Sequence, residues 1–134
     1  MNSVYRYLGV VSALALLLAV GSAAAQTGPS PELKAWFEKE DKNHDGALDH
    51  AEFQHAVVEM FYFRDKNKNG YLTIEELRGA SPEAVKAASR THDNRLNLDE
   101  YLNALFKDFA AADTNGDGKL TLEEIDAYIR TNRQ

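Results

Sequence analysis

The stretch Asp113-Thr-Asn-Gly-Asp-Gly-Lys-Leu-Thr-Leu-Glu-Glu124 carries oxygen-bearing side chains at its positions 1, 3, 5, 9 and 12. Gly118 stands at position 6, where a sharp turn favours a residue without a Cβ. Leu120, at position 8, can point away from these oxygens and pair with the equivalent residue of another loop. The spacing predicts a loop that gathers oxygen atoms around one point.

The same pattern recurs along the chain. Residues 41–52 and 65–76 match it with first residues 24 positions apart, and the match at 113–124 begins 48 positions later. The gap predicts a further loop at 89–100, so we number the four loops 1 to 4 in chain order. Position 8 is leucine in all four loops, and the residue after each loop is apolar or aromatic: Phe53, Leu77, Tyr101 and Ile125.

These loops resemble those of the EF-hand family, and the resemblance covers nearly all of residues 32–130. In that family a 12-residue loop binds Ca²⁺, a hard cation that takes six to eight oxygen ligands, from positions 1, 3, 5, 7, 9 and 12. Position 7 contributes its backbone carbonyl, and glutamate at position 12 offers both carboxylate oxygens. For loop 4 the resemblance implies these ligands: Asp113, Asn115, Asp117, Lys119, Thr121 and Glu124.

Loops 1 and 2 also follow the family pattern at every position. The implied calcium ligands are Asp41, Asn43, Asp45, Ala47, Asp49 and Glu52 in loop 1, and Asp65, Asn67, Asn69, Tyr71, Thr73 and Glu76 in loop 2. Loop 1 offers four carboxylates, loop 4 three and loop 2 two, with Lys66 and Lys68 close by. Because ligand charge tunes affinity, we expect loop 1 to bind at least as tightly as loop 4, and loop 2 most weakly. Bidentate glutamate at position 12 favours calcium over magnesium.

Loop 3, residues 89–100, departs from the family pattern. Ser89 replaces the aspartate at position 1, Thr91 stands at position 3, and Asn94 takes the glycine position. Asparagine tolerates a left-handed backbone, so the turn is expected to survive, but a principal carboxylate is lost. We expect a scaffold loop that pairs with another loop, with calcium binding there as the less favoured alternative. The chain should therefore bind about three calcium ions.

Residues 1–25 have the order of a secretory signal peptide. Arg6 is followed by the uncharged, largely apolar run 8–20, and small residues with Ala23-x-Ala25 precede Gln26. The apolar run is too short to span a bilayer comfortably, although an uncleaved anchor is an alternative. We interpret residues 26–31 as a linker and 32–134 as the EF-hand domain of an exported protein. A bacterial periplasm is the preferred location, and secretion is the alternative.

Composition argues against several functions. The net charge is −6, and one unit more negative without Arg6, which disfavours nucleic acid and suits a protein that binds cations. No membrane association is expected after signal cleavage. The chain has no cysteine, and the five-residue spacing of His50 and His55 is not a same-face helical spacing for metal. Motifs of hydrolases, zinc proteases and phosphate-binding loops are missing, so we expect a binding protein and not an enzyme.

The segments between loops predict an all-α array with short two-stranded loop pairings. Ser30 can cap a helix that begins at Pro31. Residues 53–64 and 101–112 contain no helix breaker, and each predicts one continuous helix of about 18 Å shared by two loops. The middle spacer contains Gly79-Ala-Ser-Pro82, which can end one helix and cap another, so we expect two halves hinged near residues 79–82. The pattern leaves open which loops pair.

The aromatic residues occur at helical spacings, which indicates packing in the core: Trp36, Phe37, Phe53, Phe61, Phe63, Phe106 and Phe109. An alternative is that some line an apolar groove that calcium exposes to a protein target, as in calcium sensors. The resemblance therefore implies a calcium sensor or buffer. A calcium-stabilised structural or interaction module is the alternative. Because crowded carboxylates repel one another, we expect the chain to gain order when calcium binds.

Overall fold

The computed structural model describes residues 28–77, 80 and 82–132, so the predicted signal segment 1–25 lies outside the described residues. The helices and strands, in chain order, are α2 (Pro31–Glu40), β1 (Ala47–Leu48), α3 (His50–Arg64), β2 (Tyr71–Thr73), α4 (Pro82–Ala88), β3 (Arg95–Asn97), α5 (Leu98–Ala112), β4 (Leu120–Thr121) and α6 (Leu122–Asn132). The predicted helical class with short two-stranded pairings is confirmed. None of the described helices is both long enough and apolar enough to span a bilayer.

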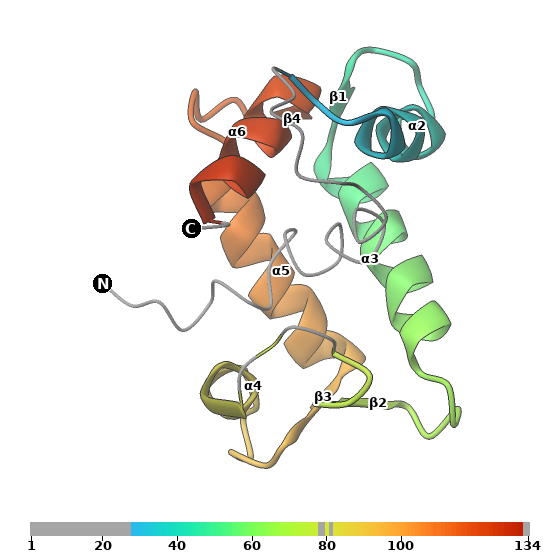
Figure 1. The fold of residues 1–134 in the computed structure, drawn as a ribbon, viewed down its shortest axis with the longest axis vertical. Helices are drawn as coiled ribbons and strands as arrows, with labels where there is room; N and C mark the ends of the chain where they lie inside the picture. Colours follow the sequence, from blue (N-terminus) through green and yellow to red (C-terminus); the bar gives the residue numbers. More distant parts are fainter. Residues whose placement is uncertain (1–27, 78–79, 81, 133–134) are drawn as a thin grey trace.

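Two long helices, α3 and α5, run side by side through the middle of the molecule (Figure 1). One end of this pair carries α2, α6, β1 and β4, and the other carries α4, β2 and β3 (Figure 1). The helices α3 and α5 are antiparallel, because Phe53 near the start of α3 contacts Phe109 near the end of α5, while Phe61 contacts Tyr101. The long helices therefore fix the distance between the two ends of the fold.

The four loops pair at the two ends of the fold. Strand β1 of loop 1 pairs with β4 of loop 4, which places Leu48 opposite Leu120. Strand β2 of loop 2 pairs with β3 of loop 3, which places Leu72 opposite Leu96. All four position-8 leucines are fully buried, as their predicted pairing requires. Loop 3, despite its altered sequence, is the partner of loop 2.

This pairing changes the expected division into two halves. Part of the predicted hinge, residues 79 and 81, lies outside the described residues. In the described chain, both loop pairs join one loop from before residues 79–82 with one from after them. One hydrophobic core also contains residues from both sides of this division. The two sequence halves are therefore packed into each other and do not form separate units.

The ends of the helices follow the local sequence. The Ser30 hydroxyl accepts a hydrogen bond from the Leu33 N–H (3.1 Å), which confirms the predicted cap of α2. The segments 53–64 and 101–112 are continuous helix, as predicted, and α3 and α5 each begin three residues earlier. The early start comes from a capping box in which positions 9 and 12 of the loop bond reciprocally, Asp49 with Glu52 in the case of α3. The last ligand positions of a loop thus also start the next helix.

The predicted helix between loop 2 and residue 79 is wrong for the residues that the structure describes. Residues 74–77 form only a turn, closed by a hydrogen bond from the Leu77 N–H to the Thr73 carbonyl (2.9 Å). Helix α4 begins at Pro82, as predicted. The first turn of a helix is costly to nucleate, and the segment between loop 2 and Gly79 is too short to repay this cost. Pro82 prevents the segment from continuing as a longer helix.

The aromatic residues fill the core with one clear exception. Trp36, Phe37, Phe53, Phe61 and Phe109 are buried, and Phe106 packs partly buried against the same cluster. Phe63 was predicted to pack in the core as well, but 71% of it is exposed, and its neighbour Tyr62 is 56% exposed. Since α3 buries a face toward α2 and α5, Phe63 lies on the remaining face, where the Lys66 ammonium covers its ring at 4.0 Å.

A buried carboxyl group joins α5 to α6 and makes the stability depend on pH. Asp108 accepts a hydrogen bond from the Tyr128 hydroxyl (2.6 Å). Burial raises the pKa of Asp108 from 3.8 to about 7, and the hydrogen bond from Tyr128 only partly offsets this. The folded protein therefore holds this proton more tightly than the unfolded chain does, so the stability from this group falls as the pH rises from about 4 to about 7.

We expect Asp108→Asn to weaken this pH dependence. The amide keeps an oxygen for the Tyr128 hydroxyl and carries no charge at any pH. Between pH 5 and pH 8 the wild type loses stability through Asp108 and the variant does not. The difference in free energy of unfolding, variant minus wild type, should therefore increase by more than about 1 kcal/mol from pH 5 to pH 8. Denaturant unfolding at both pH values, in saturating calcium, measures the difference. The exposed and partly paired Asp99→Asn is the control, and an equal pH response in both variants would contradict the assignment.

Candidate metal-binding loops

Loop 1 brings its carboxylates together most closely. One carboxylate oxygen each from Asp41, Asp45 and Glu52 lie within 4.8 Å of one another. Asp41 caps the C-terminus of α2, and Glu52 lies in the first turn of α3, so two helices position them. Asp41 and Glu52 are buried while Asp45 is exposed. Gathering three acidic groups in so little space creates a strongly negative site that a divalent cation would neutralise.

The aspartate at position 1 is held in the same way in loops 1, 2 and 4. Its Oδ2 accepts a hydrogen bond from the N–H of the glycine at position 6, at 2.9 Å for Gly46, Gly70 and Gly118 alike. Its Oδ1 accepts from the N–H at position 5. These glycines have φ of +85°, +80° and +79°, a left-handed conformation that explains why glycine is required there. The backbone thus orients the first carboxylate toward the centre of the loop.

The glutamate at position 12 closes each loop. In loop 1, Glu52 accepts hydrogen bonds from the Asn43 N–H and the Asp49 N–H, both at 3.1 Å. In loop 2, Glu76 accepts from the Lys66 N–H (2.9 Å) and the Thr73 N–H (3.0 Å). In loop 4, Glu124 accepts hydrogen bonds from the Thr121 N–H (2.9 Å) and the Thr114 hydroxyl (3.3 Å). The carboxylate oxygens of Asp113, Asp117 and Glu124 lie farther apart than those of the three acidic residues in loop 1.

The side chains at positions 3, 5 and 9 also form hydrogen bonds within their loops. The Asn43, Asn67 and Asn115 side chains at position 3 each accept a hydrogen bond from the N–H at position 5. The position-5 side chains accept in turn from the N–H at position 7, that is from Ala47, Tyr71 and Lys119. Thr73 and Thr121, at position 9, donate their hydroxyls to the position-12 glutamates. Each loop is therefore already folded around its own oxygen atoms.

Loop 3 corrects one sequence expectation. Asn94 was expected to keep the left-handed turn at position 6, but the non-glycine residues with positive φ in the described chain are His44, Lys68 and His92, all at position 4. In loops 1, 2 and 4 the second oxygen of an aspartate at position 1 accepts from position 6. Ser89 has only one side-chain oxygen, so this bond and the conformation it favours are both lost.

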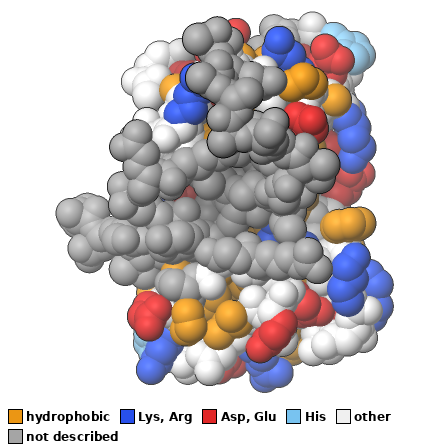
Figure 2. Space-filling model, viewed as in Figure 1, with side chains coloured by type: hydrophobic (Ala, Val, Ile, Leu, Met, Phe, Trp, Pro, Cys, Tyr) orange, Lys and Arg blue, Asp and Glu red, His pale blue; other side chains and the backbone are white. Residues whose placement is uncertain are grey.

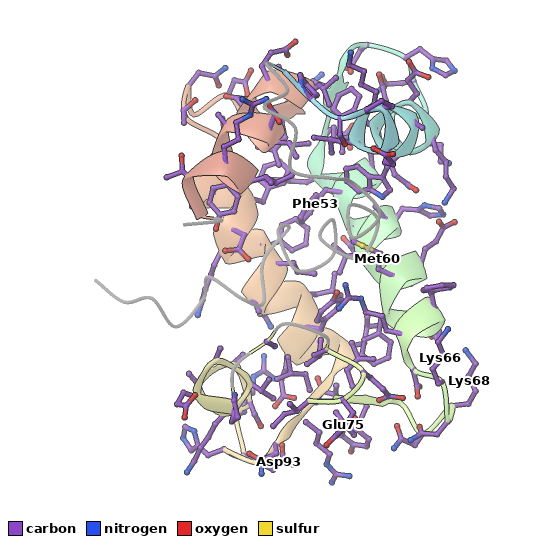
Figure 3. The ribbon with its side chains drawn as sticks, viewed as in Figure 1. Phe53, Met60, Lys66, Lys68, Glu75 and Asp93 are labelled. Carbon is purple, nitrogen blue, oxygen red and sulfur yellow. The ribbon has the colours of Figure 1, made fainter. Side chains whose placement is uncertain are left out.

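The polar groups of loop 3 satisfy one another. The Ser89 hydroxyl donates to Asp93 Oδ1 (2.9 Å), and the Arg95 guanidinium pairs with Asp93 Oδ2 (3.2 Å). These contacts, the Ser89 hydrogen bond first, hold the pKa of Asp93 below its usual value. Figure 3 shows Asp93 at the end of the fold that carries α4 and β3. A guanidinium therefore pairs with this carboxylate, and loop 3 has no carboxylate at position 1.

A lysine that the sequence placed in loop 4 reaches the metal ligands of loop 1. The Lys119 ammonium donates to Asp45 Oδ2 at 2.6 Å, across the β1–β4 pair. This hydrogen bond is the main cause that lowers the pKa of Asp45. The sequence pattern indicates only the backbone carbonyl of Lys119 as a ligand, because nothing in the pattern shows that loops 1 and 4 are neighbours. The side chain is a cation that an incoming metal ion has to displace.

We expect Lys119→Met to tighten calcium binding at loop 1. The substitution removes the ammonium that competes for Asp45 and leaves the backbone carbonyl of loop 4 in place. Removing one nearby exposed positive charge should increase the affinity about two- to fivefold at low ionic strength, and less in high salt. Calorimetric titration with calcium measures the change. Lys107→Met, on the exposed side of α5, is the control, and an unchanged affinity for Lys119→Met would contradict a role for this contact.

The donor set of loops 1, 2 and 4 suits one kind of ion. Every predicted ligand is an oxygen atom, from carboxylates, amides, hydroxyls and carbonyls. Oxygen sets of this size suit hard cations, and the flexible spacing and the glutamate at position 12 favour Ca²⁺ over the smaller Mg²⁺. The hydrogen bonds that fold each loop leave the residues able to hold that ion. The residues present therefore fit calcium.

Helices that flank oxygen-lined 12-residue loops, with the loops paired through short strands, define a helix–loop–helix metal-binding protein. A family model described as an EF-hand domain pair matches residues 57–130, and one described as EF hand matches residues 33–58. The chain belongs to the EF-hand family and is a calcium-binding protein. No curated protein matches the chain.

Proposed function

We propose that this protein is an exported calcium sensor or buffer with three binding sites, in loops 1, 2 and 4. The observation that carries the proposal is the contrast between loops. Asp41, Asp45 and Glu52 of loop 1 crowd their oxygens within 4.8 Å, whereas loop 3 has the single hydroxyl oxygen of Ser89 in place of the carboxylate at position 1. Loops 2 and 4 share with loop 1 the hydrogen bonds that orient the aspartate at position 1. Loops whose side-chain oxygens all serve as metal ligands support ion binding and not catalysis.

Two features of α3 support a sensor. Tyr62 and Phe63 expose large aromatic rings on its surface, and they border a cavity of about 670 Å³ between α2 and α3. The cavity walls also include Trp36 and Met60, and Met60 lies on the side of α3 that faces the middle of the fold (Figure 3). An apolar side chain of a protein target fits such a cavity, and flanking exposed aromatics suit its rim. Because α3 leaves loop 1 and enters loop 2, it is the helix that calcium would reposition.

A calcium-stabilised structural module is the second candidate. It is favoured by the position-12 glutamates, which are already bonded to their own loops, and by the complete burial of the paired leucines. A protein built in this way gains stability from calcium without changing the surface it presents. The two candidates therefore differ in whether calcium changes the exposure of apolar surface.

Calorimetry and a hydrophobic dye, read in the same calcium titration, separate these candidates. A sensor gives three binding events with a rise in dye fluorescence, and Phe63→Ala reduces that rise without changing the heats. A structural module gives the same binding events with constant or falling dye fluorescence. Fewer than three binding events would contradict the proposal of three sites.

Matched neighbouring glutamates assign the binding events to loops. Glu76→Gln removes a ligand at position 12 of loop 2, and Glu75→Gln changes its exposed neighbour. We expect the first variant to lose one binding event and the second to keep all three. Figure 3 shows Glu75 at the β2–β3 end of the molecule, so the control substitution changes the same part of the fold as Glu76→Gln.

We infer export from the order of the N-terminal segments, with the bacterial periplasm as the preferred location. Support comes from the charge at Arg6, the apolar run 8–20 and the small residues before Gln26. Expression in a bacterium followed by fractionation should give a mature chain that begins at Gln26, which intact mass measures. Leu16→Arg should retain the precursor inside the cell and Leu16→Ile should not. A full-length chain in the cytoplasm would contradict export.

A further inference from the structure

A second cluster of metal-ligating side chains lies outside the loops, between α2 and α3. It consists of Glu40 at the end of α2, and His55 and Glu59 one turn apart on α3. One ligand atom from each residue lies within 4.8 Å of the other two. The His55 ring stands between the two carboxylates, with Nδ1 at 3.8 Å from Glu40 Oε2 and Nε2 at 3.9 Å from Glu59 Oε1.

The Glu40 carboxylate is the fixed point of this cluster. Only 1% of Glu40 is exposed, and its Oε2 is buried without a hydrogen-bond partner in the described part of the chain. A buried carboxylate oxygen without a partner is costly, and its presence calls for a ligand. This oxygen lies 3.8 Å from Nδ1 of the His55 ring, and all three residues of the cluster line the cavity between α2 and α3. The cavity provides room for an ion and for a water molecule beside it.

A lysine ammonium holds the remaining carboxylate oxygens. Lys39 Nζ lies 2.9 Å from Glu40 Oε1 and 2.7 Å from Glu59 Oε2, and its side chain is 59% exposed. The ammonium therefore neutralises part of the charge of two carboxylates but leaves Glu40 Oε2 without a hydrogen bond. Because Lys39 has a long, exposed side chain, it can turn into solvent when a divalent ion takes its place beside the two carboxylates. The two carboxylates would then match the charge of a divalent ion.

We propose that Glu40, His55 and Glu59 form a zinc-binding site that is separate from the calcium loops. Zinc binds both imidazole nitrogen and carboxylate oxygen, and a set of three protein ligands leaves the fourth position to water. Ligands about 2.1 Å from a tetrahedral ion are about 3.4 Å apart, so the cluster has to contract by little more than 1 Å. The exposed His55 and Glu59 side chains can make this movement while Glu40 stays fixed. The imidazole nitrogen disfavours calcium, which takes oxygen ligands.

The sequence contains part of this site in the spacing of a histidine and a glutamate, whereas the spacing of the two neighbouring histidines, His50 and His55, gives no metal pair. His55 and Glu59 are four residues apart, a same-face spacing on one helix, whereas His50 turns away and packs against the Phe106 and Phe109 rings. The third ligand comes from another helix, so only the packing of α2 on α3 completes the set. Glu40 directly precedes Asp41, the first ligand of loop 1, and His55 lies about one helical turn after Glu52, the last ligand of that loop. Zinc would therefore tie together the two helices that flank loop 1.

Zinc titration of the purified protein in saturating calcium tests the proposal. Calcium fills the loops, and competition with a chelator of known affinity reports the zinc affinity. We expect one zinc ion per chain and a change in the fluorescence of Trp36, the single tryptophan, which lines the same cavity. His55→Ala should weaken binding at least about tenfold, since even residues that only support a ligand contribute that much. Manganese and magnesium should bind more weakly than zinc.

Three further measurements keep the test specific. Lys39→Met should strengthen zinc binding, because it removes the competing ammonium. His92→Asn, at an exposed histidine of loop 3, should leave zinc binding unchanged. The calcium titration of His55→Ala should match wild type, which shows that the variant is folded and separates this site from the proposed calcium function. Zinc binding that is unaffected by His55→Ala, or that vanishes in saturating calcium, would overturn the proposal and leave the cluster as ion pairs alone.

Discussion

Saturating calcium should raise the melting temperature of this protein on the order of 30 °C above that of the chelator-treated protein. Each site filled at 100 times its Kd contributes about 2.7 kcal/mol, so three sites contribute about 8 kcal/mol. For a domain of this size, 1 kcal/mol corresponds to at least about 4 °C. Without the ion, the carboxylates of Asp41, Asp45 and Glu52 repel one another at short range, and two of them are buried.

Thermal unfolding followed by circular dichroism, in calcium and in chelator, measures this effect. Glu124→Gln should remove about one third of the increase, because it deletes the position-12 ligand of loop 4. Glu123→Gln changes the exposed adjacent residue at the same helix start and should retain the full increase. Equal melting temperatures in calcium and chelator would show that the loops do not couple ion binding to folding.

Leu96→Ala should destabilise the protein by about 2–5 kcal/mol and weaken calcium binding in loop 2, although residue 96 belongs to a loop that we expect to bind no ion. Leu96 is fully buried and lies opposite Leu72 in the β2–β3 pair. The same pair places Tyr71 opposite Asn97 and Thr73 opposite Arg95. Two ligand positions of loop 2 therefore depend on strand β3 for their alignment.

Leu120→Ala is the matched control for this experiment. It makes the same truncation in the other loop pair, where Leu120 lies opposite Leu48. We expect the calcium affinity of loop 1 to fall in this variant and that of loop 2 to be retained. Calorimetry assigns the sites when each substitution is combined with Glu76→Gln, which removes the loop 2 ligand. If Leu96→Ala instead weakened loop 4, the pairing of loop 2 with loop 3 would be contradicted.

Local chemistry made a large part of this fold predictable from the sequence. The hydrogen bonds of Asp41, Asp65 and Asp113 to glycines five residues away occur inside single loops, so a short pattern specifies them. The helices 53–64 and 101–112 were predicted for the same reason, since uninterrupted helix formers and capping residues act over a few positions. Burial of the position-8 leucines followed from their repetition.

The sequence was less informative where one local preference competed with another. Asn94 can adopt a left-handed backbone, but whether it does depends on an acceptor at position 1, and Ser89 offers no second oxygen. Phe63 has the helical spacing of its aromatic neighbours, yet it lies beyond the face that α3 buries. Asn94 can adopt either a left-handed or a right-handed backbone, and Phe63 can be either buried or exposed. In each case the contacts with other parts of the chain decide which of the two occurs.

The sequence by itself determined where the loops begin and which segments form the two long helices, and hence that this is a calcium-binding protein of the EF-hand family. The tertiary structure alone decided that loop 1 pairs with loop 4 and loop 2 with loop 3. It also placed Lys119 on Asp45, and Glu40 beside His55. The physical reason is that all four loops carry the same leucine at position 8, so the pattern contains no preference among partners. That preference comes from the packing of α3 against α5, which fixes which ends of the chain meet.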